Sequence, residues 1–403
     1  MTTTLDPPAP NRLLSLDAFR ASVILSMVFV NYLPGMPDIP GWLLHADPTV
    51  DGFTFTDVVF PGFLFIAGVA IPLAYRRRLE RGETRSSILR HLLVRSGSLI
   101  FLGVLMVNTG RYDEASATLS RDAWSLLAYL CAIGLCLRPG GDSTRQLNTI
   151  RAAALIGMAL LLVLYRGISS ETAWSWLVPS WWGILGIIGW AYLTAGGVWL
   201  LVRGSPSALT GALGLMVALY IGDRRGVLDF LSPIRTWWDV GQLAGSHPAI
   251  VTAGILAGTN LRPDRSVLRS DTVRLAGLGL GLLAGGFLLR PLHGFHKIGG
   301  TESYALATAG ICTLAFLLFH IVIDRLGFTA GTALLQPVGA NPLLAYLLPD
   351  VLDKVMSLTG SWALFWPLWS AGGWAGMLNA ALMTAAVLGL TWALTRWGIV
   401  LRL

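Results

Sequence analysis

The stretch from Asn31 to Pro61, NYLPGMPDIPGWLLHADPTVDGFTFTDVVFP, holds the residue types that acid–base chemistry needs. His45 stands near its middle and is followed by Asp47, Asp51 and Asp57. An imidazole accepts and delivers protons near neutral pH, and a neighbouring carboxylate fixes its tautomer and strengthens it as a base. His45 is therefore a candidate proton-transfer residue, although a surface histidine in a polar loop is the commoner case for such a pattern.

Two further polar residues lie at the ends of apolar runs. Asn31 ends the run MVFVN, and Asp57 begins the run TDVVFPGFLF. An amide at a helix end caps the helix or binds a substrate carbonyl, and capping is the simpler interpretation. An acidic residue at a helix N-terminus complements the helix dipole, so Asp57 also has a structural explanation. The chain between them is rich in proline and glycine, which is typical of backbone that lines a wet cavity.

A second polar cluster, RPLHGFHKIGGTE, runs from Arg290 to Glu302. His293 and His296 have the spacing HxxH, but no third ligand accompanies them, so we expect no metal. A substrate-binding loop is an open interpretation, with His296 and Lys297 as its candidate residues. Asn341, in VGANPLL, interrupts a later apolar segment and is a third substrate-binding candidate, because broken helices often line binding sites in membrane proteins.

The densest basic cluster, YRRRLERGETRSSILRHLLVR, ends at Arg95. Cytoplasmic loops collect Lys and Arg and contact lipid headgroups, which is the preferred interpretation for any single arginine here. Guanidinium groups also suit phosphates, so a cytoplasmic phosphate site is the sharper alternative. Its candidate residues are Arg20, Arg76, Arg77, Arg90 and Arg95. Arg20 also has a simple alternative as the partner of Asp17, three residues before it.

Membrane-spanning helices must position these residues. Of the 403 residues, 54% are hydrophobic and 13% are charged, about half of the ~25% charged residues of a soluble chain. The charges fall in short bursts between apolar runs, which argues against nucleic-acid binding despite a net charge of +7. We predict an all-α, polytopic integral membrane helical bundle of about 10–12 transmembrane helices. The expected segments are residues 16–33, 53–75, 88–107, 123–137, 152–165, 182–202, 208–221, 248–261, 273–289, 304–323, 334–348 and 374–397.

The loop charges predict the orientation of the chain. With the N-terminus inside, 20 of the 29 Lys and Arg residues fall on the cytoplasmic side. Both termini are therefore expected in the cytoplasm. No short signal-peptide core is visible near the start, so the first apolar run is expected to be a retained helix. The simplest organisation is one transmembrane domain, residues 1–403, with residues 1–15 as a cytoplasmic tail. Exposed apolar helix faces would permit a homodimer.

Several stretches of the sequence together resemble a known family. They are SLDAFRA, MVFVNY, HA and DGFTFTDVVFPGFLFIAGVAIPLA near the start, then ILRHLLVRSGSLIFLGVLMVN, SHPAIVTAGILAG, FHKIGGTESYALATAG and VGANPLLAYL. They resemble the heparan-alpha-glucosaminide N-acetyltransferase family, most closely its bacterial relatives of unassigned substrate. The resemblance covers most of the chain, and its first stretches are the most specific. The family's LQRI motif is replaced here by WSLLAYL, residues 124–130.

The resemblance implies a multi-helix acetyltransferase in a bacterial inner membrane. Such an enzyme takes acetyl from cytoplasmic acetyl-CoA and passes it to the amine of a glucosamine on the far side. The family's active-site histidine matches His45, and its motif asparagine and aspartate match Asn31 and Asp57, which become the candidate catalytic residues. For a bacterial relative, the expected acceptor is an amino sugar of the cell envelope, or a hydroxyl on one.

The reach of acetyl-CoA limits where the two sites can lie. Its extended pantetheine arm is roughly 15–20 Å long, whereas the hydrocarbon core is ~30 Å thick. Either the nucleotide sinks into the bundle or the His45 loop dips inward, or both. His45 would then act as a general base or carry the acetyl group itself, and the sequence leaves both routes open. A backbone donor or Asn31 would stabilise the oxyanion.

Two other classes of protein fit the same composition. A transporter or flippase of a sugar- or lipid-linked substrate is also polytopic and also uses broken helices. Few charges lie inside the apolar runs and no inverted repeat is visible, which argues against that class. A non-catalytic membrane scaffold is the third alternative, and it predicts that substitutions of His45 and Asn31 are silent.

Overall fold

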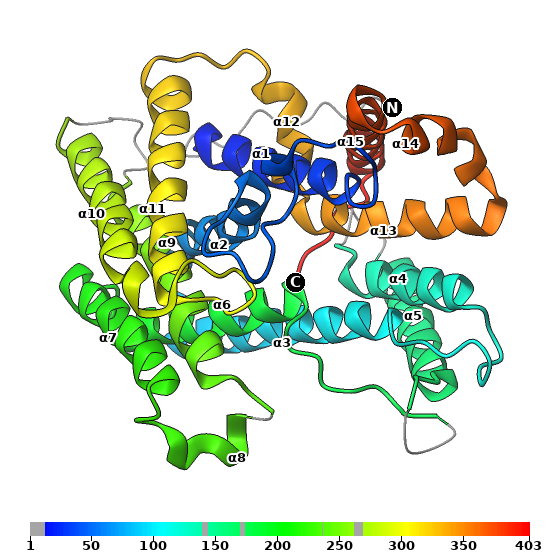
Figure 1. Cartoon of the computed structure of the whole chain (residues 1–403), viewed down its shortest axis with the longest axis horizontal. Helices are drawn as coiled ribbons and strands as arrows, with labels where there is room; N and C mark the ends of the chain where they lie inside the picture. Colours follow the sequence, from blue (N-terminus) through cyan, green and yellow to red (C-terminus); the bar gives the residue numbers. More distant parts are fainter. Residues whose placement is uncertain (1–12, 139–143, 170–173, 236, 262–268) are drawn as a thin grey trace.

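The computed structural model describes residues 13–138, 144–169, 174–235, 237–261 and 269–403. Within these ranges the chain is helical, with no strand and three isolated backbone bridges. The longer helices (Figure 1) are α1 (Leu14–Asn31), α2 (Phe55–Glu80), α3 (Arg85–Thr109), α4 (Arg121–Cys136), α5 (Thr144–Leu164), α6 (Ile184–Leu201), α7 (Pro206–Arg224), α9 (His247–Thr259), α10 (Arg269–His293), α11 (Glu302–Phe319), α12 (Thr332–Ala340), α13 (Pro342–Thr359) and α15 (Gly373–Arg396). Shorter helices are η1 (Gly41–Leu43), η2 (Asp229–Leu231), α8 (Ser232–Arg235), η3 (Gly241–Ser246), η4 (His320–Arg325), η5 (Ser361–Leu364) and α14 (Trp366–Ala371).

Nine helices in the described part of the chain are long and apolar enough to cross a membrane. They are α1, α2, α3, α5, α6, α7, α10, α11 with its continuation η4, and α15. The predicted class, an all-α polytopic membrane bundle, is confirmed. The three remaining predicted segments are helical as well, but they form the shorter helices α4 and α9 and the interrupted pair α12–α13.

The predicted segment 334–348 is broken at Asn341, where α12 ends and α13 begins. The Asn341 amide donates to the carbonyl oxygen of Ile399 at 2.8 Å, and its side-chain oxygen accepts from the N–H of Leu401 at 3.1 Å. The C-terminal segment therefore holds the break. α13 continues well past residue 348 to Thr359, and hydropathy missed this half because it carries Asp350, Asp353 and Lys354.

The crossing of α2 and α9 lies at the centre of the bundle. A Cβ atom at Gly68 would lie 2.0 Å from the carbonyl oxygen of Val251, and one at Gly254 would lie 2.1 Å from that of Phe65. Only glycine permits this approach, which gives close van der Waals packing where hydrophobic exclusion from water is absent. Every residue of α9 except Thr259 is buried. The rigid centre therefore includes α2, the helix that carries Asp57 at its start.

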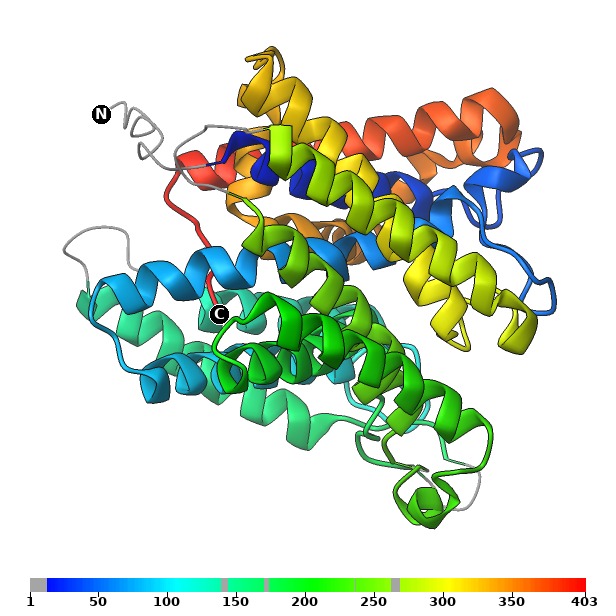
Figure 2. The same cartoon turned by 90° about the vertical axis from the view of Figure 1, so that its left-hand side faces the viewer.

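The two ends of the bundle carry different parts of the chain (Figure 2). One end, here called the basic end, holds the arginine-rich turn between α2 and α3, the first described turn of α1 and the C-terminus. There the Ser15 hydroxyl donates to Asp324, and Leu137 forms a backbone bridge with Leu401. The opposite end, the loop end, holds residues 32–54 and 294–301. Of the predicted tail 1–15, residues 1–12 lie outside the described part.

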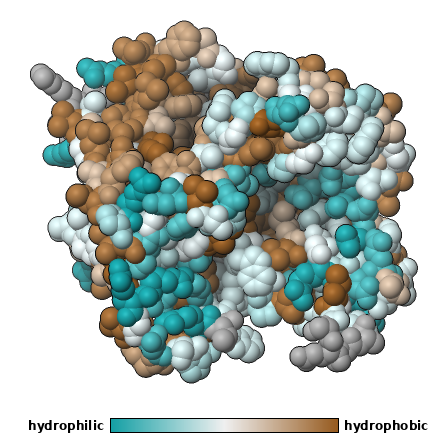
Figure 3. Space-filling view, viewed as in Figure 1, coloured by the Kyte–Doolittle hydropathy of each residue, from teal (hydrophilic) through white to brown (hydrophobic). Residues whose placement is uncertain are grey.

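Hydropathy varies across the molecular surface in the way expected of a bundle with lipid-facing helices. Figure 3 shows hydrophobic residues gathered along α11 at the upper left and hydrophilic residues gathered around the C-terminal end of α7 and α8 at the lower left. Exposed large side chains include Leu288 of α10 and Leu318 of α11. In water such exposure would be costly, whereas in a bilayer the hydrocarbon tails cover it.

Candidate active site

The loop after α1 folds back onto α15 before it reaches His45. Leu33, Met36 and Leu43 are buried in a small cluster with Ala380 of α15. The backbone N–H of Gly373 donates to the carbonyl oxygen of Pro37 at 2.9 Å. These contacts hold the proline-rich loop, so the predicted irregular backbone is packed against protein as membrane depth requires.

His45 forms an ion-pair contact with Asp57 at the start of α2. The Nδ1 atom of His45 lies 2.7 Å from Oδ1 of Asp57. The other carboxylate oxygen accepts from the backbone N–H groups of Ala46 and Thr54, each at 3.0 Å. Thr54 and Asp57 form a capping box at the first turn of α2. The residues that start the helix therefore also fix the carboxylate against the imidazole.

This geometry determines which ring nitrogen of His45 can react. An ionised carboxylate only accepts hydrogen bonds, so Nδ1 carries the proton and donates to Asp57. The lone pair then lies on Nε2, which points away from the carboxylate. The Asp57 side chain is 1% exposed, whereas the His45 side chain is 47% exposed. A buried carboxylate thus orients an accessible base, which is the arrangement of a catalytic His–Asp pair.

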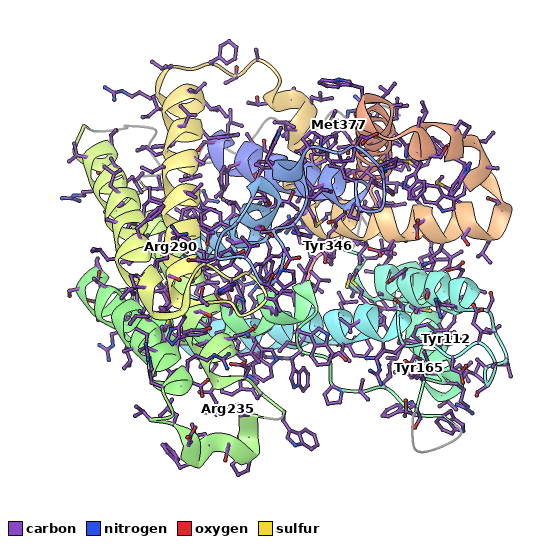
Figure 4. The ribbon with its side chains drawn as sticks, viewed as in Figure 1. Tyr112, Tyr165, Arg235, Arg290, Tyr346 and Met377 are labelled. Carbon is purple, nitrogen blue, oxygen red and sulfur yellow. The ribbon has the colours of Figure 1, made fainter. Side chains whose placement is uncertain are left out.

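A second loop, residues 294–301, is joined to the His45 loop by several bonds. Asp51 accepts from the backbone N–H of Phe295 at 2.6 Å, and Gly52 donates to the carbonyl oxygen of Phe295 at 3.1 Å. Arg290, labelled in Figure 4 at the end of α10, donates to Asp51 at 3.0 Å. The rings of Phe53 and Phe295 pack edge to face at 5.2 Å. These contacts therefore hold the His45 loop and residues 294–301 together, although the two loops are far apart in sequence.

The joined loops bring Lys297 to His45. The Lys297 Nζ atom lies 2.9 Å from Nδ1 and 3.2 Å from Nε2 of His45. It also lies 3.6 Å from Oδ1 of Asp57. Burial lowers the pKa of Lys297, and the attraction of the Asp57 carboxylate opposes that shift. The ammonium group therefore lies beside both ring nitrogens of His45 and next to the Asp57 carboxylate.

A small cavity of about 40 Å³ lies at these residues. Asn31, His45 and Lys297 supply three of its polar side chains, and Thr56 of α2 supplies a fourth. Its remaining walls are apolar residues of α1, α2 and α6. A cavity of this size has room for a few heavy atoms, since a water molecule takes about 30 Å³ in the liquid. It accommodates a small reacting group and excludes a nucleotide.

Four of the predicted site residues thus meet at the loop end, namely Asn31, His45, Asp57 and Lys297. His296 lies in the same loop as Lys297, and its backbone N–H donates to Thr301. Asn341 lies elsewhere, since its amide bonds the C-terminal segment after α15. In this conformation Asn341 therefore holds the broken helix, and a substrate contact for it remains a prediction.

The five predicted phosphate-binding arginines differ in their environment. Arg76, Arg77 and Arg90 are exposed at the basic end. Twenty residues of α2 separate Thr56 from Arg76, which is about 30 Å along the helix. Arg20 donates to the carbonyl oxygen of Gly339 at 2.9 Å and pairs with Asp17. These four positions are too far from the cavity, or too engaged, to hold a donor whose arm reaches His45.

Arg95 is different because it lies ten residues inside α3. Its guanidinium packs over the Tyr192 ring at 4.9 Å, and its Nε atom is buried with no hydrogen-bond partner among the described residues. The Tyr192 hydroxyl lies 3.2 Å from that of Tyr75. Ile184, which lines the cavity, precedes Tyr192 by eight residues of α6, about 12 Å along the axis. Because this separation is shorter than the pantetheine arm, Arg95 is the favoured candidate of the five for holding the donor.

Sequence reasoning did not identify Thr54, Tyr304 or the contact between Lys297 and His45. Thr54 was detectable, because T-x-x-D before an apolar run is a capping signature. The buried Tyr304 hydroxyl donates to the carbonyl oxygen of Asp57 at 2.6 Å and fixes the first turn of α2 from α11. No local sequence pattern predicts that hydrogen bond, because 247 residues separate its partners.

The first half of the chain matches a family of related sequences. The family described as "Domain of unknown function (DUF5009)" matches residues 12–230. The chain belongs to this family. The matched region contains Asn31, His45, Asp57 and Arg95, whereas Lys297 lies beyond it.

Two curated relatives extend the likeness over most of the chain. The chain is 27% identical to the heparan-alpha-glucosaminide N-acetyltransferase of Mus musculus over 384 residues, which cover 85% of this chain and 54% of that protein. It is 26% identical to the protein of the same name from Homo sapiens over 373 residues, 86% of this chain and 54% of the other. The chain thus spans about half the length of the curated relatives it matches. The resemblance inferred from sequence motifs is confirmed.

Proposed function

We propose that this protein is a membrane acetyltransferase that moves an acetyl group from cytoplasmic acetyl-CoA to an amino sugar at the loop end. The observation that supports it most is the contact of an accessible His45 with a buried Asp57 inside a small polar cavity. The similarity to two membrane N-acetyltransferases supports the reaction class. The amine, or a hydroxyl in its place, is the acceptor atom.

In direct transfer, His45 acts as the general base. Its Nε2 takes a proton from the acceptor amine while the amine nitrogen forms a bond to the acetyl carbonyl carbon. The carbon–sulfur bond then breaks, and the CoA thiolate leaves with the proton that His45 returns. In the alternative, Nε2 attacks the thioester carbon first, the carbon–sulfur bond breaks and the CoA thiolate leaves. The amine then attacks the acetyl-imidazole, the bond from Nε2 to the acetyl carbon breaks, and the released imidazole takes the amine proton. Asp57 stabilises the positive imidazole in both routes.

Lys297 and Asn31 are the polar side chains best placed to stabilise the oxyanion. Both line the cavity with His45, and the Lys297 ammonium lies 3.2 Å from Nε2. A positive group beside the developing negative oxygen in a partly desolvated site lowers the barrier, commonly by about 3 kcal/mol for one donor.

The donor would enter from the basic end. A phosphate or the pantetheine amide group held by Arg95 would lie about 12 Å from the cavity along α6, and the ~15–20 Å arm covers that distance. The surface arginines Arg76, Arg77 and Arg90 would attract the nucleotide to the entrance. The nucleotide therefore sinks partly into the bundle, and the cavity receives the acetyl end alone.

The experiment uses purified protein in lipid nanodiscs with radiolabelled acetyl-CoA and glucosamine. We expect CoA release and N-acetylglucosamine with wild type, and neither with His45→Ala. Release of CoA without sugar acetylation would support acetyl-CoA as the donor and reject glucosamine as the acceptor. If wild type neither binds nor turns over acetyl-CoA, the proposal is wrong. The hypothesis to test next is then ion-coupled transport of a sugar-linked substrate.

A further inference from the structure

A second cavity, far larger than the first, lies beside the active site at the loop end. It is a groove of about 550 Å³ between α1 and α15, within the size range of ligand pockets. Leu25 and Phe29 of α1 form one wall, and Ala381, Ala385 and Leu388 of α15 form the other. No charged residue lines it. Of its polar side chains, Thr384 donates its hydroxyl to the carbonyl oxygen of Ala380 in its own helix. The groove therefore suits an apolar occupant.

The groove and the His45 cavity share a wall. Phe29 lines the groove, and Asn31, two residues later on α1, lines the cavity. Likewise Phe55 lines the groove, whereas its neighbour Thr56 lines the cavity. The Thr56 hydroxyl donates at 2.6 Å to the carbonyl oxygen of Leu43, a groove residue two positions before His45. Both spaces therefore lie at the loop end, on two faces of α1, and a head group that extends past Trp42 at the end of the groove comes to the His45 loop.

The position of the groove in the bundle indicates the chemistry of the molecule that would occupy it. Trp42 and Phe55 lie at the loop end of the groove, exposed by 61% and 45%, with ring centroids 6.3 Å apart. On α15 the groove runs from Ala381 to Leu388, which is about 10 Å along the helix axis. That length lies within the ~15 Å that one leaflet contributes to a ~30 Å hydrocarbon core. An aromatic entrance at the interface and an apolar interior are the chemistry of a hydrocarbon chain in the outer leaflet.

We infer that the acceptor is an amino sugar carried on a lipid, whose hydrocarbon chain lies in the α1–α15 groove while its amine reaches His45. This inference rests on the proposed acetyl transfer and names the class of acceptor. The amine forms its bond to the acetyl carbon, the carbon–sulfur bond of acetyl-CoA breaks, and the amine proton passes through His45 to the thiolate. A membrane-held acceptor also explains why the catalytic cavity itself is small.

The test compares dodecyl glucosaminide with methyl glucosaminide in nanodiscs, since both carry the same amine. Ala385→Trp fills the groove, and Ala386→Trp is the matched control, because Ala386 is an exposed neighbour that does not line it. We expect kcat/KM at least 10-fold higher for the dodecyl compound in wild type. Ala385→Trp should reduce this ratio to about 1, and Ala386→Trp should leave it unchanged. Equal use of both sugars by wild type, or equal behaviour of the two variants, would overturn the inference.

A binding measurement keeps the inference testable if neither sugar is acetylated, an outcome that counts against the proposed function alone. A dodecyl glucosaminide with a diazirine in its tail is photolysed in nanodiscs, and the adducts are mapped by mass spectrometry. We expect adducts on the groove residues of α1 and α15 that dodecyl glucosaminide competes away and dodecyl maltoside does not. Adducts spread over other helices, or equal competition by both compounds, would show ordinary lipid filling and reject the groove as an acceptor site.

Discussion

Two His–Asp pairs of nearly identical geometry lie at opposite ends of the molecule. At the loop end, Nδ1 of His45 lies 2.7 Å from Asp57, and at the basic end Nδ1 of His320 lies 2.8 Å from Asp324. The first imidazole is 47% exposed and borders a cavity, whereas the second is 4% exposed and stacks on Phe316. The hydrogen bond alone therefore does not distinguish a reactive pair from a structural one.

The surroundings of the two pairs explain their different roles. Asp324 also accepts from the Ser15 hydroxyl and so joins η4 to the start of α1. The groove that runs along η4 is lined by Phe319, Val322 and Ile323 and not by His320. The second oxygen of Asp57 instead accepts from the backbone at the start of α2, and Nε2 of His45 lies 3.2 Å from the Lys297 ammonium. An exposed ring beside a cavity, with a cation next to it, sets the proposed catalytic pair apart.

The largest effect is expected at the open pair. His45→Gln removes the base and leaves a side chain of similar size, so kcat should fall by about 10²–10⁴-fold with little change in Tm. The measurement is acetyl transfer in nanodiscs together with a thermal melt. His320→Gln is the matched control, because it loses the same Nδ1 contact in a buried setting.

For the control, we expect the reverse pattern. His320→Gln should lower stability by about 1–3 kcal/mol and leave kcat of the folded fraction within a factor of about 2. A large loss of kcat in His320→Gln with an unchanged melt would reverse the assignment of the two pairs.

Asp57→Asn should give the next largest effect. The amide cannot stabilise a positive imidazole, and it can turn the ring to the wrong tautomer, so kcat should fall about 10–10³-fold. The variant also weakens the capping box, at a cost of about 1 kcal/mol. Steady-state kinetics and a melt separate the two effects. Asp324→Asn should affect the melt alone, and similar kinetic losses in both variants would remove the distinction.

Lys297→Met tests whether the cation contributes to the open pair. Loss of the ammonium group near Nε2 should lower kcat about 10–100-fold, because the oxyanion loses a positive neighbour. Lys297→Arg keeps the positive charge and should restore kcat at least in part. A kcat of Lys297→Met within a factor of about 2 of wild type would place the lysine outside the catalytic step.

Arg95→Leu tests whether Arg95 binds acetyl-CoA on its way to the His45–Asp57 pair. The KM for acetyl-CoA should rise about 10-fold, because Arg95 is the favoured candidate for holding the donor. Arg90→Leu, five residues earlier and exposed, is the matched control and should change KM less than about 2-fold. Equal changes in the two variants would indicate surface attraction alone.

The smallest effect concerns the bond that pins the two loops. The N–H of Phe295 and the guanidinium of Arg290 hold the pKa of Asp51 below its usual range. The folded pKa thus lies below the unfolded value near 4, so the stabilisation is complete above about pH 4 and is lost as the pH falls through the lowered pKa. Hydrogen exchange at Phe295 should accelerate in that range, relative to the intrinsic rate. Asp51→Asn should remove most of this pH dependence, and unchanged dependence would mean that another group pins the loop.

The sequence predicted most of the fold because the bilayer imposes a simple rule. Each apolar run must become a helix, and all twelve expected segments are helical. The part that failed was α13, since Asp350, Asp353 and Lys354 interrupt its hydropathy. One of these charges is satisfied by a distant partner, Asp122 of α4, which lies 2.9 Å from Lys354. Such a compensation depends on tertiary structure and leaves no local signal.

The candidate site was predicted only in part, for a similar reason. His45 and Asp57 lie 12 residues apart, and both were predicted because they share one short stretch that is rich in proline, glycine and acidic residues. Lys297 was found as a polar loop residue, but its contact with His45 spans 252 residues and depends on Asp51 and Phe295. Asn341 was predicted to break a helix, and the backbone is broken there. The sequence pattern does not indicate at which end of the bundle the break lies.

The most direct measurement of the difference between the two pairs needs no knowledge of the acceptor. Diethyl pyrocarbonate acylates accessible, unprotonated imidazoles, and peptide mass spectrometry reports the rate at His45 and at His320 in the same nanodisc sample, with and without acetyl-CoA. We expect rapid modification of His45 that acetyl-CoA slows at least about 5-fold, and slow modification of His320 that acetyl-CoA does not change. Modification of His45 no faster than of His320, or no protection of His45 by acetyl-CoA, would contradict the assignment of the two pairs.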